Sequence, residues 1–231
     1  MKGFSFILEI LYFATFRKPN STSLILTFTV PPFTTLRGMI SNALGLPRDD
    51  YSLQDRLKFG ISVKKTGIKN TEVLKILKFI KTDKKSKKKR QPWDMKNYPS
   101  SPLFHEFLTS FVYKIYLASE DEKLLTNIRE RMGNPIRSLY LGQSDDLIDI
   151  SEVSSIVNVK NTMASKFSSI ISNTIIPGVV LEKLPYAFKE ANGKYFVEYR
   201  MVAIPVNGYV DLEKPKEGYI FEKEKEVVEL F

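Results

Sequence analysis

The chain has 231 residues, of which 43% are hydrophobic, so it can build a core for one large domain or two small ones. It contains no cysteine and a single histidine, which excludes a disulfide framework and a thiolate metal site and argues against a histidine-rich metal centre. We therefore expect neither a metal ion nor a cofactor, and the formal net charge of +9 indicates a polyanionic partner.

The positive charge is concentrated between Lys58 and Arg90. This segment has 13 Lys and Arg against Glu72 and Asp83, a net charge of +11, so the rest of the chain sums to −2. Its densest part, KTDKKSKKKRQP, has no apolar residue and predicts an exposed, mobile tip. The candidates for phosphate contacts in it are Lys84, Lys85, Lys87, Lys88, Lys89 and Arg90. A solvated lysine loop without a ligand is the alternative.

The N-terminal part predicts a strand, a loop and a helix. Residues 3–16 alternate in the manner of a strand that is buried on at least one face. Glu9 interrupts this apolar stretch, and no apolar run of about 18 residues occurs, so we expect a soluble, cytoplasmic protein. A second extended run, LILTFTV, ends at two prolines. Thr34 or Thr35 is then predicted to cap a helix that Gly45 stops.

The middle of the chain alternates strands with a second helix. Residues 57–65 predict a short strand, whereas 71–80 fit either a helix or one arm of a hairpin. FHEFL and VYKIYL predict two strands joined by a turn at residues 109–111. A helix from Asp121 to Met132, capped near Ser119, precedes RSLYLGQSDDLIDI, which contains another short strand.

This order predicts an α+β fold with a ferredoxin-like sheet and two helices on one face. From residue 151 onward the chain is strand-rich, with turns at Asn192-Gly193 and Asn207-Gly208. KYFVEYRMVAIPV is expected to form a hairpin beside a terminal strand. The C-terminal part either extends the same sheet or forms a smaller β-domain.

No catalytic motif is present: we find no glycine-rich nucleotide-binding pattern and no nucleophile elbow. The pairs Asp49-Asp50 and Asp145-Asp146 each follow a glycine at a turn, which favours solvated loop acids over a metal site. Alternation places His105 on the same face as Phe107, so a structural or RNA-contacting role is favoured over general acid–base catalysis.

Several cations and small polar groups could form an anion site at one edge of the predicted sheet. Arg37 lies near a helix N-terminus, where a cation opposes the helix dipole unless an anion binds beside it. Exposed amides around Gly38 and the hydroxyls of Thr34 and Thr35 would meet the same phosphate. Other cations expected at this edge are Arg17, Lys18 and Arg137. A plain capped helix with a surface arginine is the alternative.

Four ordered blocks resemble the CRISPR-associated Cas-five family, a branch of the repeat-associated mysterious proteins (RAMP superfamily). VPPFTTLRGMISNALGL resembles the proline-threonine-glycine segment of that family, and ILYFATFRKP resembles its first strand. HEFLTSFVYKIYL is similar to the paired strands after its insertion, and NPIRSLYLGQSDDLIDI is similar to its Tyr-Leu-Gly-x-Ser motif.

The resemblance implies an RRM-like ferredoxin domain at residues 1–150, an inserted basic thumb at about 64–100, and a strand-rich region at 151–231. It also implies a non-catalytic, crRNA-binding subunit of a type I Cascade complex in antiviral defence, closest to the I-B or I-A branches. The partners would be the 5′ handle of the CRISPR RNA, a backbone RAMP subunit and a large subunit, with no membrane.

Within that resemblance, Arg37, the amides near Gly38 and Asn42 would contact the RNA, and Tyr12 or Tyr140 would stack on bases. One branch of the family cleaves precursor RNA with a Tyr, Lys and His group. No Lys adjoins His105, which departs from that pattern. A metal-independent endoribonuclease using His105 and a nucleic-acid scaffold unrelated to CRISPR are the alternatives.

Overall fold

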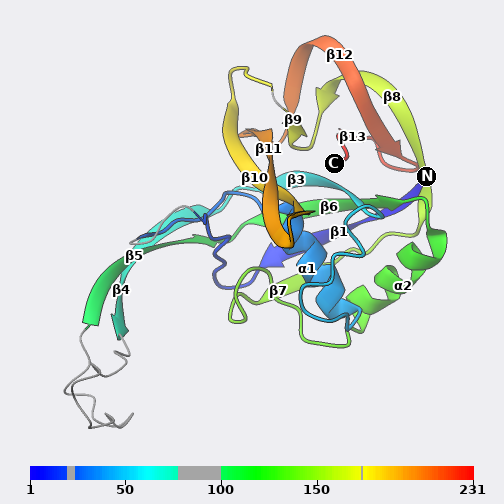
Figure 1. The fold of residues 1–231 in the computed structure, drawn as a ribbon. Coiled ribbons are helices and arrows are strands. Elements are labelled where there is room, and N and C mark those ends of the chain that lie inside the picture. Colours follow the sequence, from blue (N-terminus) through cyan, green and yellow to red (C-terminus); the bar gives the residue numbers. More distant parts are fainter. Residues whose placement is uncertain (20–23, 78–99, 173) are drawn as a thin grey trace.

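A computed structural model of the protein describes residues 1–19, 24–77, 100–172 and 174–231 (Figure 1). The predicted lysine tip, with Lys84 to Arg90, lies outside the described residues. The elements in chain order are β1 (Lys2–Ile10), β2 (Leu24–Ile25), α1 (Phe33–Ala43), β3 (Lys58–Lys65), β4 (Ile68–Leu77), β5 (Ser100–Thr109), β6 (Val112–Ser119), α2 (Glu122–Gly133), β7 (Ile148–Ser151), β8 (Val157–Phe167), β9 (Ile171–Ser172), β10 (Val179–Ala191), β11 (Lys194–Pro205), β12 (Val210–Phe221) and β13 (Val227–Val228).

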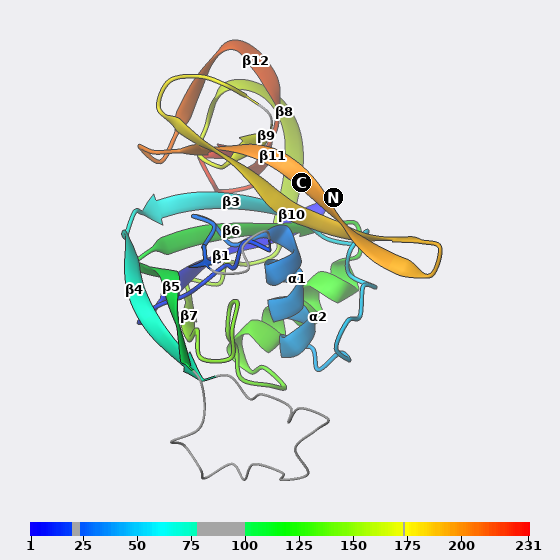
Figure 2. The ribbon, with the colours of Figure 1, turned by 60° about the vertical axis from the view of Figure 1, so that its left-hand side comes forward.

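The central sheet places β1 between β6 and β7, with β3 on the far side of β6. All of these pairs are antiparallel. α1 lies between β1 and β3 in the chain, α2 lies between β6 and β7, and both helices lie on the same face of the sheet (Figure 2). Leu36 and Ile40 of α1 and Leu125 and Ile128 of α2 are fully buried in one core with the inner face of β1. Burial of that face stabilises the layered arrangement.

The first strand is shorter than predicted. It ends at Ile10, and Leu11, Tyr12 and Phe13 leave the sheet with exposed side chains. The run LILTFTV forms only the two-residue strand β2, followed by an isolated bridge between Arg17 and Thr27.

The predicted cap of α1 is wrong. The N-cap residue is Pro32, which has no side-chain donor or acceptor, and Thr34 and Thr35 lie inside the helix. Because Pro32 has an extended ψ of 150°, its carbonyl can accept from the amides of both Thr35 and Leu36. The predicted stop is confirmed, because Gly45 takes the left-handed φ of 72° that favours glycine after a helix.

The second helix has its cap two residues beyond the predicted position. The carboxylate of Asp121 accepts from the amide of Leu124 at 2.9 Å, and the Ser119 hydroxyl accepts from the amide of Asp121. A carboxylate at this end also complements the helix dipole.

Residues 71–77 belong to a hairpin arm and not to a helix. β4 pairs with β5 from Ile68–Thr109 to Leu77–Ser100, and the two strands project away from the rest of the fold (Figure 1). The base of the arm is joined to the segment after β1, since Ala14 and Leu108 exchange backbone hydrogen bonds of 3.0 and 2.8 Å.

The C-terminal strands divide between two sheets. β8 pairs with β1 at Lys2 and Gly3 and with β12 over most of its length, so these strands continue the central sheet. β10 and β11 form a long hairpin around Asn192-Gly193, as the turn residues predict, with φ of 53° and 68°. The expected pairing of residues 194–205 with a terminal strand is therefore wrong, because this two-residue turn folds β11 back onto β10.

Within the described ranges, neither helix has the length and apolar character needed to cross a bilayer.

Candidate nucleic-acid interface

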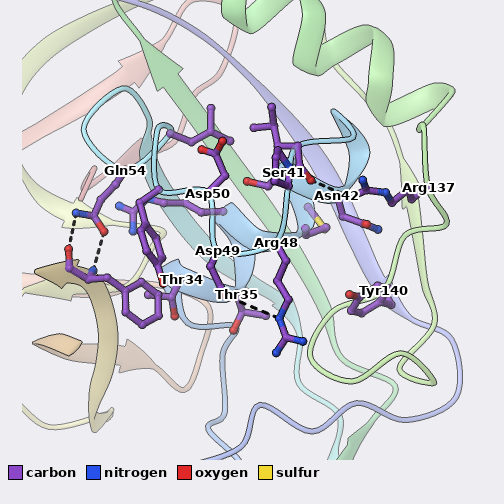
Figure 3. A pocket seen from close by; sticks show the side chains of 18 of the residues that line it. Thr34, Thr35, Ser41, Asn42, Arg48, Asp49, Asp50, Gln54, Arg137 and Tyr140 are labelled. Atoms are coloured by element: carbon purple, nitrogen blue, oxygen red, sulfur yellow. Dashed lines mark hydrogen bonds and ion pairs between the residues drawn. The ribbon is translucent and has the colours of Figure 1, made fainter. Parts of the chain in front are cut away.

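An open hollow of about 560 Å³ lies against the exposed face of α1 (Figure 3). Its other walls are the segment after α1, at residues 46–54, and the loop before β7. Seven residues predicted to contact RNA line it: Thr34, Thr35, Arg37, Gly38, Asn42, Arg137 and Tyr140. These seven residues come from two segments, 34–42 and 137–140, which are almost 100 residues apart in the chain and lie around the same hollow.

Small polar side chains form the α1 wall. Thr34, Gly38 and Ser41 are spaced four and three residues apart, which places them on one helix face. Within the described chain, the hydroxyls of Thr34, Thr35 and Ser41 have no hydrogen-bond partner. Asn42 donates from Nδ2 to the Ser138 carbonyl at 2.6 Å, which leaves its Oδ1 available as an acceptor. The wall therefore offers uncharged hydrogen-bonding groups.

Gly38 takes a different role from the one predicted. It is the sixth residue of α1, and amides beyond the first turn already bond within the helix, so its amide is not free for a phosphate. A side chain added at Gly38 would meet no atom within 4 Å. Gly38 is exposed and opens the helix backbone to whatever enters the hollow.

Arg37 is buried. The sequence predicted either an exposed arginine that contacts a phosphate or a plain surface arginine, and both predictions required an exposed side chain. Only 7% of the residue is exposed, because β10 packs against its side of α1. Its Nη1 donates to the Tyr186 carbonyl, and its guanidinium lies 5.3 Å from the ring centre of Tyr186 and 5.6 Å from that of Phe59. Burial lowers the pKa of Arg37. Its Nε and Nη2 have no partner in the described chain.

The loop before β7 contributes Arg137 and Tyr140. Arg137 donates to the carbonyls of Leu46 and Gly45 at 2.8 and 3.2 Å, so its cation sits at the C-terminal end of α1, where the helix dipole favours it. Tyr140 keeps 38% of its surface exposed at the edge of the hollow. Its ring is free for stacking.

The segment after α1 carries charges that sequence analysis did not assign to the site. The side chain of Arg48 is 95% exposed and lies 3.8 Å from the carboxylate of Asp49. Hydrogen bonds from Ser52, first from its side chain and then from its amide, lower the pKa of Asp50, which is therefore ionised at neutral pH. Three arginine residues and two aspartate residues thus line the hollow, and the guanidinium of Arg37 among them is buried against Tyr186 and Phe59.

Gln54 joins this segment to the β10–β11 hairpin. Its Nε2 donates to the Phe188 carbonyl at 2.9 Å, and its Oε1 accepts from the Phe188 amide at 2.6 Å (Figure 3). No pattern in the sequence relates the two residues, which are 134 positions apart.

The prediction that Asp145 and Asp146 are both solvated is wrong for Asp146, which is 1% exposed. Its Oδ2 accepts from the amides of Thr15 and Gln143 at 2.9 and 3.0 Å. Burial raises the pKa of Asp146, against the lowering effect of these two hydrogen bonds. The carboxylate fixes the loop that presents Tyr140.

Arg17 and Lys18 do not line the hollow. Lys18 donates to Glu182 at 3.1 Å and lies over the Phe28 ring, while Arg17 is exposed beside the bridge to Thr27. The sequence predicted that Arg17, Lys18, Arg37 and Arg137 lie together at one edge of the sheet. Of these four residues, Arg37 and Arg137 line the hollow.

His105 lies at the base of the arm and is 7% exposed. Its Nδ1 is 2.8 Å from Glu72, and its Nε2 is 2.8 Å from the Thr15 hydroxyl. The imidazole is 5.8 Å from the Phe107 ring, so the shared face predicted for the two is confirmed. Among the described residues, no group of three His, Cys, Asp or Glu could hold a metal ion.

Residues 9–199 match the model of the family described as CRISPR-associated protein (Cas_Cas5). Because this match spans most of the 231 residues, the chain belongs to that family. The resemblance inferred from the four sequence blocks is confirmed, which argues against a scaffold unrelated to CRISPR. Comparison with curated proteins finds no similar sequence.

Solved structures share the fold at low sequence identity. A chain of a CRISPR RNA-guided surveillance complex is 15% identical, with a TM-score of 0.54 over 89% of this chain and 92% of its own. A CRISPR protein from Archaeoglobus fulgidus is also 15% identical, with a TM-score of 0.50 over 99% and 98% of the two chains. A further Cas protein is 14% identical, with a TM-score of 0.50 over 90% and 98%.

Proposed function

We propose that this protein is a non-catalytic subunit of a type I CRISPR effector complex and holds the 5′ handle of the CRISPR RNA. One observation carries the proposal: in a chain of this family, seven of the residues predicted to contact RNA gather around one open hollow. The shared fold of a chain from an RNA-guided surveillance complex supports assembly with other Cas subunits.

The topology supports the finer description of the fold. Around the central sheet, the chain order β1–α1–β3–β6–α2–β7 and the sheet order β7-β1-β6-β3 support the proposed ferredoxin-like, RRM-like domain. β4 of the β4–β5 arm lies within the segment at about residues 64–100 that is predicted to be a thumb, and β5 follows that segment. In this proposal the arm and its lysines reach the RNA and a neighbouring backbone RAMP subunit, a large subunit completes the assembly, and the complex acts in the cytoplasm.

The groups around the hollow suit single-stranded RNA. Arg48 and Arg137 supply positive charge for phosphates, and Tyr140 supplies a stacking surface. The Thr34 and Thr35 hydroxyls can pair with ribose 2′-hydroxyls, which distinguish RNA from DNA.

The test is binding of a fluorescent RNA that carries the repeat-derived 5′ handle, measured at several salt concentrations. We expect affinity to fall steeply with salt, and Arg48→Gln to weaken binding and reduce the salt dependence by about one phosphate contact. Lys214→Gln is the charge-matched control, because Lys214 is exposed on β12 outside the hollow. Affinity that does not change with salt would contradict the proposal.

We propose that His105 does not cleave RNA, because both ring nitrogens are engaged and the residue is buried. Precursor CRISPR RNA incubated with the protein in EDTA should stay intact. Cleavage that His105→Ala abolishes, with RNA binding retained, would instead establish the endoribonuclease alternative.

A further inference from the structure

His105 connects the β4–β5 arm to the segment after β1, and no step of the proposed function uses it. Its Nδ1 lies 2.8 Å from Oε1 of Glu72, the residue that pairs with it across the arm. Its Nε2 lies 2.8 Å from the Thr15 hydroxyl, which is in turn 3.2 Å from the Glu106 carbonyl. Glu72, His105 and Thr15 thus form a continuous row of side chains, which we call the arm joint.

The protons of the arm joint show which form of His105 it suits. Both ends of the row are acceptors, since neither the Glu72 carboxylate nor the Glu106 carbonyl has a proton to give. The row has three contacts, and each needs one proton. A neutral imidazole and the Thr15 hydroxyl supply one proton each, and an imidazolium supplies one more. All three contacts are hydrogen bonds only when His105 carries both ring protons.

Burial makes this difference matter for stability. Thr15 is 1% exposed and His105 is 7% exposed, so water has little access to replace a hydrogen bond that the row loses. The side chain of Glu72 is 46% exposed, so the row reaches solvent at that end and His105 can exchange its proton there. Histidine changes its charge between about pH 5 and pH 8. The number of hydrogen bonds in the arm joint therefore depends on pH in this range.

Two negative charges face the imidazole, which suits an imidazolium in a buried position. Glu72 lies 2.8 Å away, and Asp146, in the loop before β7, interacts electrostatically with His105. Glu106 and Lys69, whose charged groups are 3.9 Å apart, project from the opposite face of the arm, because neighbouring residues in a strand point to opposite faces. The other ionisable side chains described around His105 are exposed or pair elsewhere: Tyr12, Arg17, Lys18, Lys75, Tyr140 and Asp145.

Thr15 links the row to the rest of the fold. Its amide donates to the Asp146 carboxylate at 2.9 Å. The preceding residue, Ala14, exchanges backbone hydrogen bonds with Leu108 at the base of the arm. A hydrogen bond gained or lost at the Thr15 hydroxyl therefore acts at the place where the arm is attached.

We propose that His105 is a proton-dependent latch that holds the β4–β5 arm against the rest of the fold. With both ring protons present, the imidazolium closes the arm joint between Glu72 and Thr15. Loss of one proton leaves one contact without a hydrogen, and the base of the arm then opens more often. The inference goes beyond the proposed function, because it concerns the protein without RNA.

The first test measures the protons of His105 directly. Long-range ¹H–¹⁵N spectra of the untagged chain report one imidazole, because the chain contains one histidine. At about pH 5 we expect two ring N–H protons that exchange slowly with solvent, and at about pH 8 we expect one. A single N–H proton at about pH 5, or two that exchange as fast as those of an exposed histidine, would overturn the latch.

The second test measures the attachment of the arm by hydrogen exchange at the Leu108 amide, which donates to Ala14 at 2.8 Å. Protection is corrected for the intrinsic effect of pH on exchange. From about pH 5 to about pH 8 we expect this protection to fall about five- to tenfold, because one buried hydrogen bond is lost. The amide of Ile115, in the buried strand β6, is the control and should keep its protection.

Thr15→Val removes the hydroxyl and keeps the amide that bonds to Asp146. The dependence of Leu108 protection on pH should disappear in this variant, and protection should stay at the low value that the wild type has at about pH 8. Thr15→Ser is the matched control, because it restores the hydroxyl and should restore the dependence on pH.

Glu72→Gln provides an independent variant that does not rely on the folding of Thr15→Val. Without the negative charge, the arm should lose its protection at a lower pH than in the wild type. Asp149→Asn, which removes an exposed carboxylate on β7, should behave as the wild type does.

Leu108 protection that does not vary with pH in the wild type, or that varies equally in the wild type and in Thr15→Val, would overturn the latch. An equal effect of Glu72→Gln and Asp149→Asn would do the same. Because these measurements contain no RNA, their failure would leave the proposed function standing, and loss of RNA binding would leave the latch standing.

Discussion

The amide of Thr15 donates a hydrogen bond of 2.9 Å to the Asp146 carboxylate, 131 positions later in the chain. The hydroxyl of the same Thr15 lies 2.8 Å from His105 on the arm. Thr15 therefore connects the loop that presents Tyr140 to the base of the arm. In the proposed function these are two parts of one RNA-binding surface, and this buried contact sets their relative position.

Asp146→Ala should lower the free energy of unfolding by about 1.5–3 kcal/mol, because the amides of Thr15 and Gln143 lose a charged acceptor. Asp145→Ala, at the exposed neighbouring position, should stay within about 0.5 kcal/mol of the wild type. Urea denaturation measures both. Equal losses in the two variants would show that the buried contact does not stabilise the fold.

Gly38→Ala should raise the free energy of unfolding by about 0.5–1 kcal/mol, because alanine favours the helix and the site has room for it. Gly45→Ala should do the opposite. Its φ of 72° is left-handed, and a side chain would come within 2.9 Å of Ile136, so we expect a loss of about 1 kcal/mol or more. Thermal denaturation distinguishes the two, and a loss of stability in Gly38→Ala would show that position 38 has no room for a side chain.

Gln54→Ala should loosen the β10–β11 hairpin where it borders the hollow. The variant removes the side chain that bonds both the amide and the carbonyl of Phe188. We expect faster hydrogen exchange at Phe188 than in the wild type, with little change in the buried strand β6. Unchanged exchange at Phe188 would mean that β-sheet pairing alone holds this segment.

The cap of α2 should depend on pH. Hydrogen bonds from Leu124 and then from Arg56 lower the pKa of Asp121 below its usual range. The folded state thus favours the ionised form of Asp121. The stability that this gives is fully present above the pKa that Asp121 has in the unfolded chain, and it is lost as the pH falls through the lower pKa that Asp121 has in the folded protein. Compared with Asp121→Ser, which keeps a capping oxygen without the charge, the wild type should be more stable at neutral pH. The difference in the free energy of unfolding should shrink on acidification. A difference that does not vary with pH would contradict the charged cap.

Local patterns predicted several elements correctly. The alternation of FHEFL and VYKIYL specifies β5 and β6, and Asn192-Gly193 specifies the β10–β11 turn, because period-two burial and a two-residue turn depend only on neighbouring residues. The cap of α1 was missed because Pro32 accepts two amide hydrogen bonds through its carbonyl, so that no side-chain cap is used.

The ordered motifs also determined the family, which the match over residues 9–199 confirms. They could not determine which charges reach solvent. Arg37 is buried because β10, about 150 positions later, covers it, and Asp146 is buried because it accepts from Thr15.

By itself, the sequence determined the two helices, strands such as β5 and β6, the Asn192-Gly193 turn and the concentration of positive charge, since these follow from composition and from residues close along the chain. Only the tertiary structure decided the hollow beside α1, which is lined by Gly38, by Asp49 and Asp50 after the helix, and by Arg137 and Tyr140 almost 100 residues later. The reason is physical: burial and hydrogen bonding of a side chain depend on distant segments that pack against it, and those pairings have no local signature.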